Sequence, residues 1–143
     1  MRAVAAAATL VWSVSGCASN GDPPTQAAKF SEIYAAIFPA ASRAKCNFCH
    51  TQPASNISNG NLHTGAEGDT AAAYAALVGV TSTSKNCAGR SLVVPGNPEE
   101  SLFYLKLTAE PPCGARMPFG NGALPDAQIE TVRSWIAAGA HDD

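Results

Sequence analysis

The sequence predicts an all-α fold of several short helices joined by long loops. Apolar residues recur at helical spacing in separate short stretches, and residues typical of helix starts and ends flank them. The only strand-like run is Leu-Val-Val at residues 92–94, and one short strand cannot make a sheet. The chain has 143 residues, enough for one domain, and it contains no internal repeat.

The first predicted helix lies within residues 30–38. Its apolar side chains recur at helical spacing and form one face: Phe30, Ile33, Tyr34, Ile37 and Phe38. Pro39 disfavours helical geometry at Phe38, so we expect this helix to end or kink there. A second short helical stretch is expected to lead into Cys46.

The middle of the chain is predicted to be loop, interrupted by one short helix. Residues 51–68 are rich in Asn, Ser, Thr and Gly and contain few large apolar side chains. Asp69 is placed to cap an alanine-rich helix over residues 70–78. Residues 81–90 are predicted to be loop again.

Two further helices are predicted in the last third of the chain. Residues 97–100, Asn-Pro-Glu-Glu, combine an Asx cap, a proline in the first turn and acidic residues at the positive end of the helix dipole. This helix carries the apolar residues of 102–107 and stops before the prolines at 111–112. Asp126 opens the last helix and Gly139 ends it. Its apolar face consists of Ile129, Val132, Trp135 and Ile136.

The N-terminal segment is predicted to be removed from the mature protein. Arg2 precedes an uncharged, mostly apolar run over residues 3–14, which is too short to span a bilayer but suits the core of a secretory signal. The run ends in Val-Ser-Gly before Cys17, and this resembles a bacterial lipobox. The resemblance implies that Cys17 is lipidated and becomes the mature N-terminus. The alternative is an ordinary signal peptide with an incidental cysteine.

The predicted organisation is a signal peptide over residues 1–16, a lipid-anchored tether over 17–26 and a folded domain over 27–143. The tether contains Asn, Gly, Asp, Thr and two prolines and lacks large apolar residues. We expect an exported protein, either a periplasmic or an outer-membrane lipoprotein, that contacts the membrane through its lipid anchor.

The charge of the chain excludes nucleic acid as an expected partner. Cleavage before Cys17 leaves 8 basic and 11 acidic side chains, a net charge of −3, without a basic stripe. Export also places the cysteines in an oxidising compartment, where they pair or become ligated.

The run Cys46-Asn47-Phe48-Cys49-His50 has the pattern Cys-x-x-Cys-His, the signature of c-type haem attachment. Two thiols at this spacing reach the two vinyl groups of one haem and form thioethers. The histidine after the second cysteine then falls on one face of the iron as an axial ligand. The sequence therefore predicts one covalently bound haem c.

Three other interpretations of this motif compete. A thioredoxin-like dithiol requires a βαβ unit, which the surrounding sequence lacks. A structural zinc site needs four ligands, usually as two close pairs, and Cys87 and Cys113 are too isolated from each other to form the second pair. The third interpretation is a chance match.

Met117 is the predicted sixth ligand of the iron. It is the only methionine besides the first residue, and it lies 67 residues after His50 in a loop rich in glycine. A thioether is the usual partner of histidine in electron-transfer cytochromes and raises the reduction potential. The rival ligand is His63, which would give a bis-histidine iron of lower potential.

Three blocks of the sequence resemble small bacterial monohaem class I cytochrome c domains. They are residues 94–102 (Val-Pro-Gly-Asn-Pro-Glu-Glu-Ser-Leu), 116–118 (Arg-Met-Pro) and the last helix, which ends Trp-Ile-Ala-Ala-Gly-Ala. The resemblance covers roughly residues 30–140. It implies a cytochrome c-like fold wrapped around one haem, in which the N-terminal helix crosses the C-terminal helix beside the cofactor.

In that family the matching residues have set roles. Cys46 and Cys49 would be the thioether residues, His50 the proximal ligand and Met117 the distal ligand. The Asn-rich and Gly-rich stretch over residues 55–68 is looser than in compact members, which puts the exposure of the haem on that side in doubt.

The remaining cysteines are predicted to form a disulfide. Of the five cysteines, one is assigned to the lipid and two to the haem, which leaves Cys87 and Cys113. In an oxidising compartment these two are expected to pair, tying the loop after the middle helix to the loop that carries Met117. Two unpaired thiols are the alternative.

The function that these features predict is one-electron transfer by a carrier that is not itself a catalyst. Its partners would be redox donors and acceptors that make weak, transient contacts near the haem edge. The alternative is a haem enzyme or gas sensor, which requires a displaceable sixth ligand. A lipoprotein that binds other proteins without haem remains only if the motif is accidental.

Overall fold

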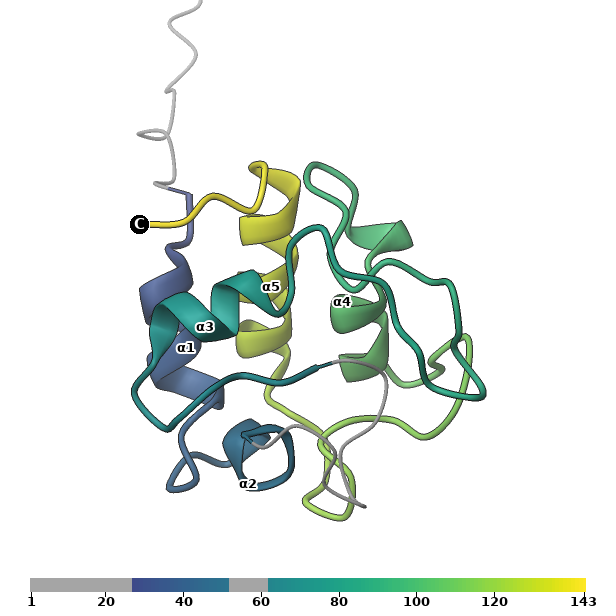
Figure 1. Ribbon diagram of the computed structural model, residues 1–143, viewed down its shortest axis with the longest axis horizontal. Coiled ribbons are helices and arrows are strands. Elements are labelled where there is room, and N and C mark those ends of the chain that lie inside the picture. Colours follow the sequence, from purple (N-terminus) through teal and green to yellow (C-terminus); the bar gives the residue numbers. More distant parts are fainter. Residues whose placement is uncertain (1–26, 52–61) are drawn as a thin grey trace, which may run out of the picture.

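A computed structural model describes residues 27–51 and 62–143 (Figure 1). Its elements are α1 (Phe30–Ile37), α2 (Cys46–His50), α3 (Thr70–Ala75), the 3₁₀ helix η1 (Pro98–Glu100), α4 (Leu102–Leu107) and α5 (Asp126–Ala137). These residues contain no β-strand, only isolated bridges, so the all-α prediction is confirmed for them. Within the same ranges, no helix is long and apolar enough to cross a membrane. The predicted signal peptide, Cys17 and the tether lie outside the described residues.

The centre of the fold is an aromatic core between α1 and α5, which pack side by side (Figure 1). Phe30 and Trp135 are almost completely buried, and their ring centroids lie 5.2 Å apart. Phe38, at the end of α1, contacts Phe30 edge-on and reaches Phe103 of α4. Burying each of these side chains contributes roughly 1.5–3 kcal/mol. The helical spacing of residues 30–38 therefore predicted both α1 and its buried face correctly.

The C-terminus is tied back to this core. The Trp135 indole donates to the His141 carbonyl, and the Tyr74 hydroxyl donates to the Ala140 carbonyl. Asp143 then accepts hydrogen bonds from the backbone N–H and the hydroxyl of Ser31 in the first turn of α1, and Figure 1 shows the C-terminus beside the start of this helix. The last residue thus caps the first helix in place of a local capping side chain.

The middle helix is shorter than predicted. α3 begins as expected, with the Asp69 carboxylate accepting from the Ala72 N–H at 2.9 Å, but it ends at Ala75 rather than at residue 78. The Leu77 and Val78 N–H groups both bond back to Tyr74, and Val78 then pairs with Val93 in a β-bridge. Because Val78 forms this bridge, the helix ends before the last apolar residues of the predicted range.

The helix predicted to begin at Asn97 is divided into two elements. Asn97 makes no side-chain cap, which contradicts the predicted Asx cap. Instead the hydroxyl of Ser101, a fully buried residue, donates to the Asn97 carbonyl and accepts from the Val94 N–H, both at 2.8 Å. Ser101 is extended and separates η1 from α4. α4 ends at Leu107, before the two prolines that were expected to stop it.

Candidate functional site

A cavity of about 910 Å³ lies between α2, α4 and the loops around them. Its wall is mainly apolar, and α1, α3 and α5 contribute no described side chain to it. Cofactor and ligand sites commonly occupy about 300–1,000 Å³ and are lined mostly by apolar groups. The cavity is therefore large enough and apolar enough for a bulky flat cofactor.

The cavity brings together the predicted site residues of two distant segments. Cys46, Cys49 and His50 line it from α2, and Met117 lines it from the loop before α5. His63, the predicted rival ligand, is half-buried but does not line the cavity. Its Nδ1 has no hydrogen-bond partner among the described residues.

α2 is positioned by a left-handed residue and a buried backbone contact. Residues 39–44 are turns rather than the predicted helical stretch, and Lys45 takes φ +53° immediately before the helix. The Asn47 N–H donates to the Phe38 carbonyl at 2.8 Å, which fixes α2 to the end of α1. The Cys46 thiol faces the cavity, and burial raises its pKa to about 12, which keeps it protonated at neutral pH.

A buried polar network holds α2 in place. Asn47, which is 2% exposed, donates from Nδ2 to the Tyr34 hydroxyl at 3.1 Å. Its Oδ1 lies 2.9 Å from the hydroxyl of Thr64, which is itself fully buried. The Gly68 N–H also donates to the Tyr34 hydroxyl, at 2.7 Å. A buried network with its polar atoms satisfied specifies one arrangement of its elements, here α1, α2 and residues 62–68.

The same segment orients His50. The Thr64 N–H donates to the His50 carbonyl at 2.7 Å, and the His50 Nδ1 lies 3.0 Å from the Leu62 carbonyl. A ring nitrogen beside a carbonyl carries the proton, so Nδ1 is the donor and Nε2 is the nitrogen suited to a metal. Burial lowers the pKa of His50, which favours the neutral ring that metal ligation requires.

The Met117 loop is attached to α4 by hydrogen bonds to its last turn. The Met117 N–H donates to the Lys106 carbonyl at 2.7 Å, and the Arg116 Nε donates to the Leu107 carbonyl at 2.9 Å. The Met117–Pro118 peptide bond is cis. The loop therefore returns to α4 at the residue that carries the thioether.

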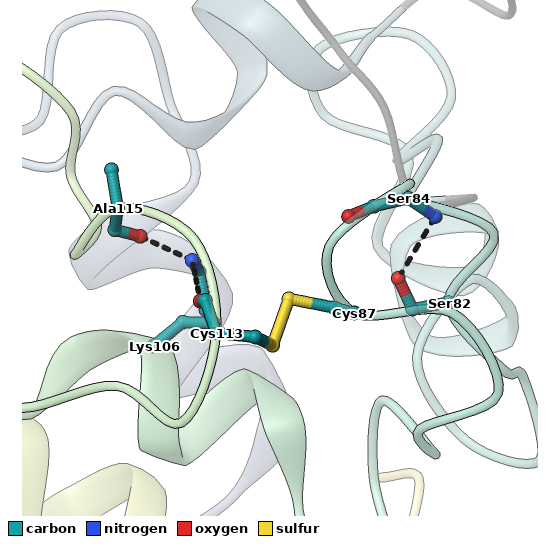
Figure 2. Close-up of a disulfide and its surroundings, with 6 residues drawn as sticks. All are labelled: Ser82, Ser84, Cys87, Lys106, Cys113 and Ala115. Atoms are coloured by element: carbon teal, nitrogen blue, oxygen red, sulfur yellow. Dashed lines mark hydrogen bonds between the residues drawn. A yellow bond between two sulfur atoms is a disulfide. The ribbon is translucent and has the colours of Figure 1, made fainter.

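The predicted disulfide is present at the rim of the cavity. Cys87 and Cys113 are bonded, with their Cα atoms 5.6 Å apart, and Figure 2 shows the bond joining two loops. One of these loops is braced by the Ser84 N–H donating to the Ser82 hydroxyl, and both serines line the cavity. The other loop continues to Met117 four residues later. The disulfide thus joins the loop after α3 to the loop that carries Met117, as predicted from the cysteines.

Several site features were not predicted from the sequence. Phe48 and Phe119 line the cavity from its two sides and are 72% and 74% exposed. Asn47 and Lys106 were not predicted either, although a lysine between Leu105 and Leu107 in an apolar helix is a visible signal. Trp135, by contrast, belongs to the α1–α5 core and does not line the cavity.

No three His, Cys, Asp or Glu side chains in residues 27–51 and 62–143 form a group that could hold a bare metal ion. Haem iron takes four of its ligands from the porphyrin and its axial ligands from opposite faces of the ring, so a haem site does not require such a group. Comparison of the chain with protein-family models, with curated proteins and with solved structures finds no match.

Proposed function

We propose that this chain is an electron-transfer c-type cytochrome with one covalent haem, attached through Cys46 and Cys49 and ligated by His50 and Met117. The observation that carries the proposal is the cavity, which His50 and Met117 line together with both cysteines although they lie 67 residues apart in the chain. A chance Cys-x-x-Cys-His would have no reason to face such a cavity or the only internal methionine. The cytochrome c-like fold is part of this proposal.

The residues of the site fit the attachment chemistry. Cys46 and Cys49 each add an S–H bond across a vinyl double bond, which forms a thioether with no net oxidation. Cys46 is a protonated thiol that already faces the cavity. The Leu62 carbonyl holds the Nδ1 proton of His50, so that Nε2 is the ligating nitrogen.

A haem held by these residues supplies a one-electron iron couple, and a His/Met ligand pair favours a high reduction potential. His50 and Met117 would both be neutral ligands, and the wall around them is mainly apolar. The exposed Phe48 and Phe119 offer a small apolar contact beside the cavity for donors and acceptors in brief encounters.

The test is a pyridine haemochrome spectrum of the protein produced with a cytochrome c maturation system. We expect the bands of a c-type haem, and a cofactor that stays with the polypeptide after denaturation. Cys46→Ala/Cys49→Ala should abolish covalent retention, whereas Cys87→Ala/Cys113→Ala serves as the control that loses two cysteines outside the motif. A wild-type spectrum without c-type bands would refute the proposal.

Carbon monoxide distinguishes the carrier from the haem enzyme or gas sensor. A six-coordinate His50/Met117 iron should bind the gas poorly in the reduced state, and Met117→Ala should bind it readily. Ready binding by the wild type, unchanged in Met117→Ala, would favour the enzyme or sensor.

We further propose that the protein is exported and anchored through a lipid on Cys17. Cys17→Ala should then move the protein from the membrane fraction to the soluble periplasmic fraction of a bacterial host. An unchanged distribution would refute the anchor without bearing on the haem.

A further inference from the structure

Lys106 occupies an unusual place in the last turn of α4. Its Nζ donates to the Cys113 carbonyl at 2.9 Å and also to the Ala115 carbonyl (Figure 2). Burial lowers the pKa of its ammonium group. Lys106 takes part in no ion pair within residues 27–51 and 62–143. Its charge is therefore satisfied by loop carbonyls.

The loop is shaped to receive this ammonium group. Gly114 lies between the two carbonyls and takes φ +59°, a left-handed conformation that glycine adopts without strain. A Cβ built at Gly114 would lie only 3.2 Å from the Lys106 Nζ. The loop backbone thus lies close to the Lys106 ammonium group, and any side chain at position 114 would contact it.

Lys106 holds the loop at a second point as well. Its own backbone carbonyl accepts from the Met117 N–H at 2.7 Å. One residue of α4 therefore binds the loop three times between Cys113 and Met117, twice through its side chain and once through its backbone. Lys106, Gly114, Ala115 and Met117 all line the cavity.

The disulfide alone does not explain how Met117 is placed. The Cys87–Cys113 bond fixes one end of the segment, four residues before the methionine. The two carbonyls that Lys106 binds lie at and after that end, on the path from the disulfide to Met117. Lys106 therefore restrains the residues between the disulfide and the Met117 sulfur atom.

We propose that Lys106 is a positioning residue that seats the Met117 thioether as the sixth ligand of the haem iron. The inference rests on the proposed His50/Met117 ligation. The charged side chain binds two carbonyls that would otherwise orient independently, and so narrows the conformations of the loop that carries the sulfur. Without it, the methionine leaves the iron more often and the sixth position opens to small ligands.

The test compares Lys106→Met with Lys106→Arg in the full-length haem-loaded protein. Lys106→Met has similar length but no donor, whereas Lys106→Arg keeps the charge and several N–H groups. Lys85→Met is the matched control, because Lys85 is exposed, lies two residues from Cys87 and does not line the cavity. The readouts are the methionine-to-ferric-iron charge-transfer band, the reduction potential and carbon monoxide binding by the reduced protein.

We expect Lys106→Met to lose most of the charge-transfer band, to lower the reduction potential and to bind carbon monoxide. Loss of a charge-assisted hydrogen bond predicts a population with the methionine off the iron that rises roughly tenfold or more. Lys106→Arg should keep most of the wild-type charge-transfer band, and Lys85→Met should have the same band as the wild type. The haemochrome spectrum should be the same in all four proteins.

A Lys106→Met protein that is less stable to heat but keeps the wild-type band and resists carbon monoxide would overturn the proposal, because the lysine would then be merely structural. If that variant does not accumulate, Lys106→Gln, which keeps a shorter donor, is expected to show partial loss, and an unchanged band there overturns the proposal equally. Absence of the band in the wild type would instead refute the Met117 ligation on which the inference rests.

Discussion

The two sides of the cavity are held in different ways. On the His50 side, the restraints are buried and noncovalent: Asn47, Tyr34 and Thr64 join three segments in a closed polar network. On the Met117 side, a disulfide at the rim and a half-buried lysine hold a loop mainly by its carbonyl groups. The first arrangement depends on hydrogen bonds between buried side chains, whereas the second depends on a covalent bond and on hydrogen bonds to backbone carbonyls.

The difference matches what each ligand needs. In the proposed cytochrome, His50 would follow a covalent attachment site and would have only to be oriented, and the Leu62 and Thr64 backbones hold its ring and carbonyl. Met117 would have no covalent bond to the proposed haem, so its loop would have to be ordered by other means. Fixing a loop residue costs about 1–2 kcal/mol of backbone entropy, and the disulfide and Lys106 offset part of that cost.

The largest expected effect comes from breaking the Met117 side with Cys87→Ser/Cys113→Ser. The sequence separation of 26 residues predicts a loss of about 3 kcal/mol in the free energy of unfolding, by release of the unfolded-chain restraint. Denaturant unfolding measures this loss. The charge-transfer band should weaken at the same time, while covalent haem retention is unchanged. An undiminished band in a destabilised variant would show that the disulfide supports the fold but not Met117.

A somewhat smaller effect is expected from breaking the His50 side with Asn47→Ala. The change leaves the buried Thr64 hydroxyl and Tyr34 hydroxyl each without one partner and should cost about 2 kcal/mol. A double-mutant cycle with Thr64→Val should give a clear coupling energy, since the two side chains share one network. Asn86→Ala, at an exposed asparagine that also lines the cavity, is the control. Additive effects would mean that the network is not cooperative.

Substitutions of two glycines in the loop around Met117 test whether the close approach to Lys106 matters. Gly114→Ala and Gly120→Ala both place a side chain at positive φ, which costs about 1–2 kcal/mol each. A Cβ at Gly120 meets nothing within 4 Å, whereas at Gly114 it meets Lys106. We expect similar losses of stability, but a perturbed charge-transfer band only in Gly114→Ala. Equal spectra would show that the close approach to Lys106 has no consequence for Met117.

The smallest effect is expected away from both sides, at Asp143. Hydrogen bonds from the Ser31 backbone and hydroxyl lower the pKa of this carboxyl below its ordinary value of 3.8. A depressed folded-state pKa stabilises the protein above the unfolded-state value, and this contribution is lost as the pH falls through the folded-state value. The difference in Tm between wild type and Asp143→Asn should therefore be present near neutral pH and shrink on acidification below 3.8. A difference that grows on acidification would contradict this role.

Several features of the fold that depend on neighbouring residues or on residue counts were predicted correctly from the sequence. The spacing of apolar residues located α1 and α5, the cysteine count paired Cys87 with Cys113, and Gly139 marked the end of the last helix. The Asx cap at Asn97 does not form, and the contact made there is instead one from the buried Ser101 hydroxyl to the Asn97 carbonyl. Whether a residue caps a helix depends on which neighbouring side chains are buried beside it, and residue preferences for cap positions do not contain that information.

The site was predictable only in part, for a similar reason. The attachment motif and Met117 are visible as residue types, and the structure lines one cavity with them. Asn47 and Lys106 act through contacts with segments far along the chain, such as Thr64 and Ala115, and no spacing rule connects those positions. Their roles follow from the fold rather than from the motif.

The most direct test of the central claim, His50/Met117 ligation of one covalent haem, is proton NMR of the reduced wild-type protein. We predict a single methionine methyl resonance shifted far upfield by the ring current of the haem, and its disappearance in Met117→Ala. A diamagnetic reduced spectrum that lacks this resonance, with the signals of two ligating histidines, would contradict the account and return His63 as the sixth ligand.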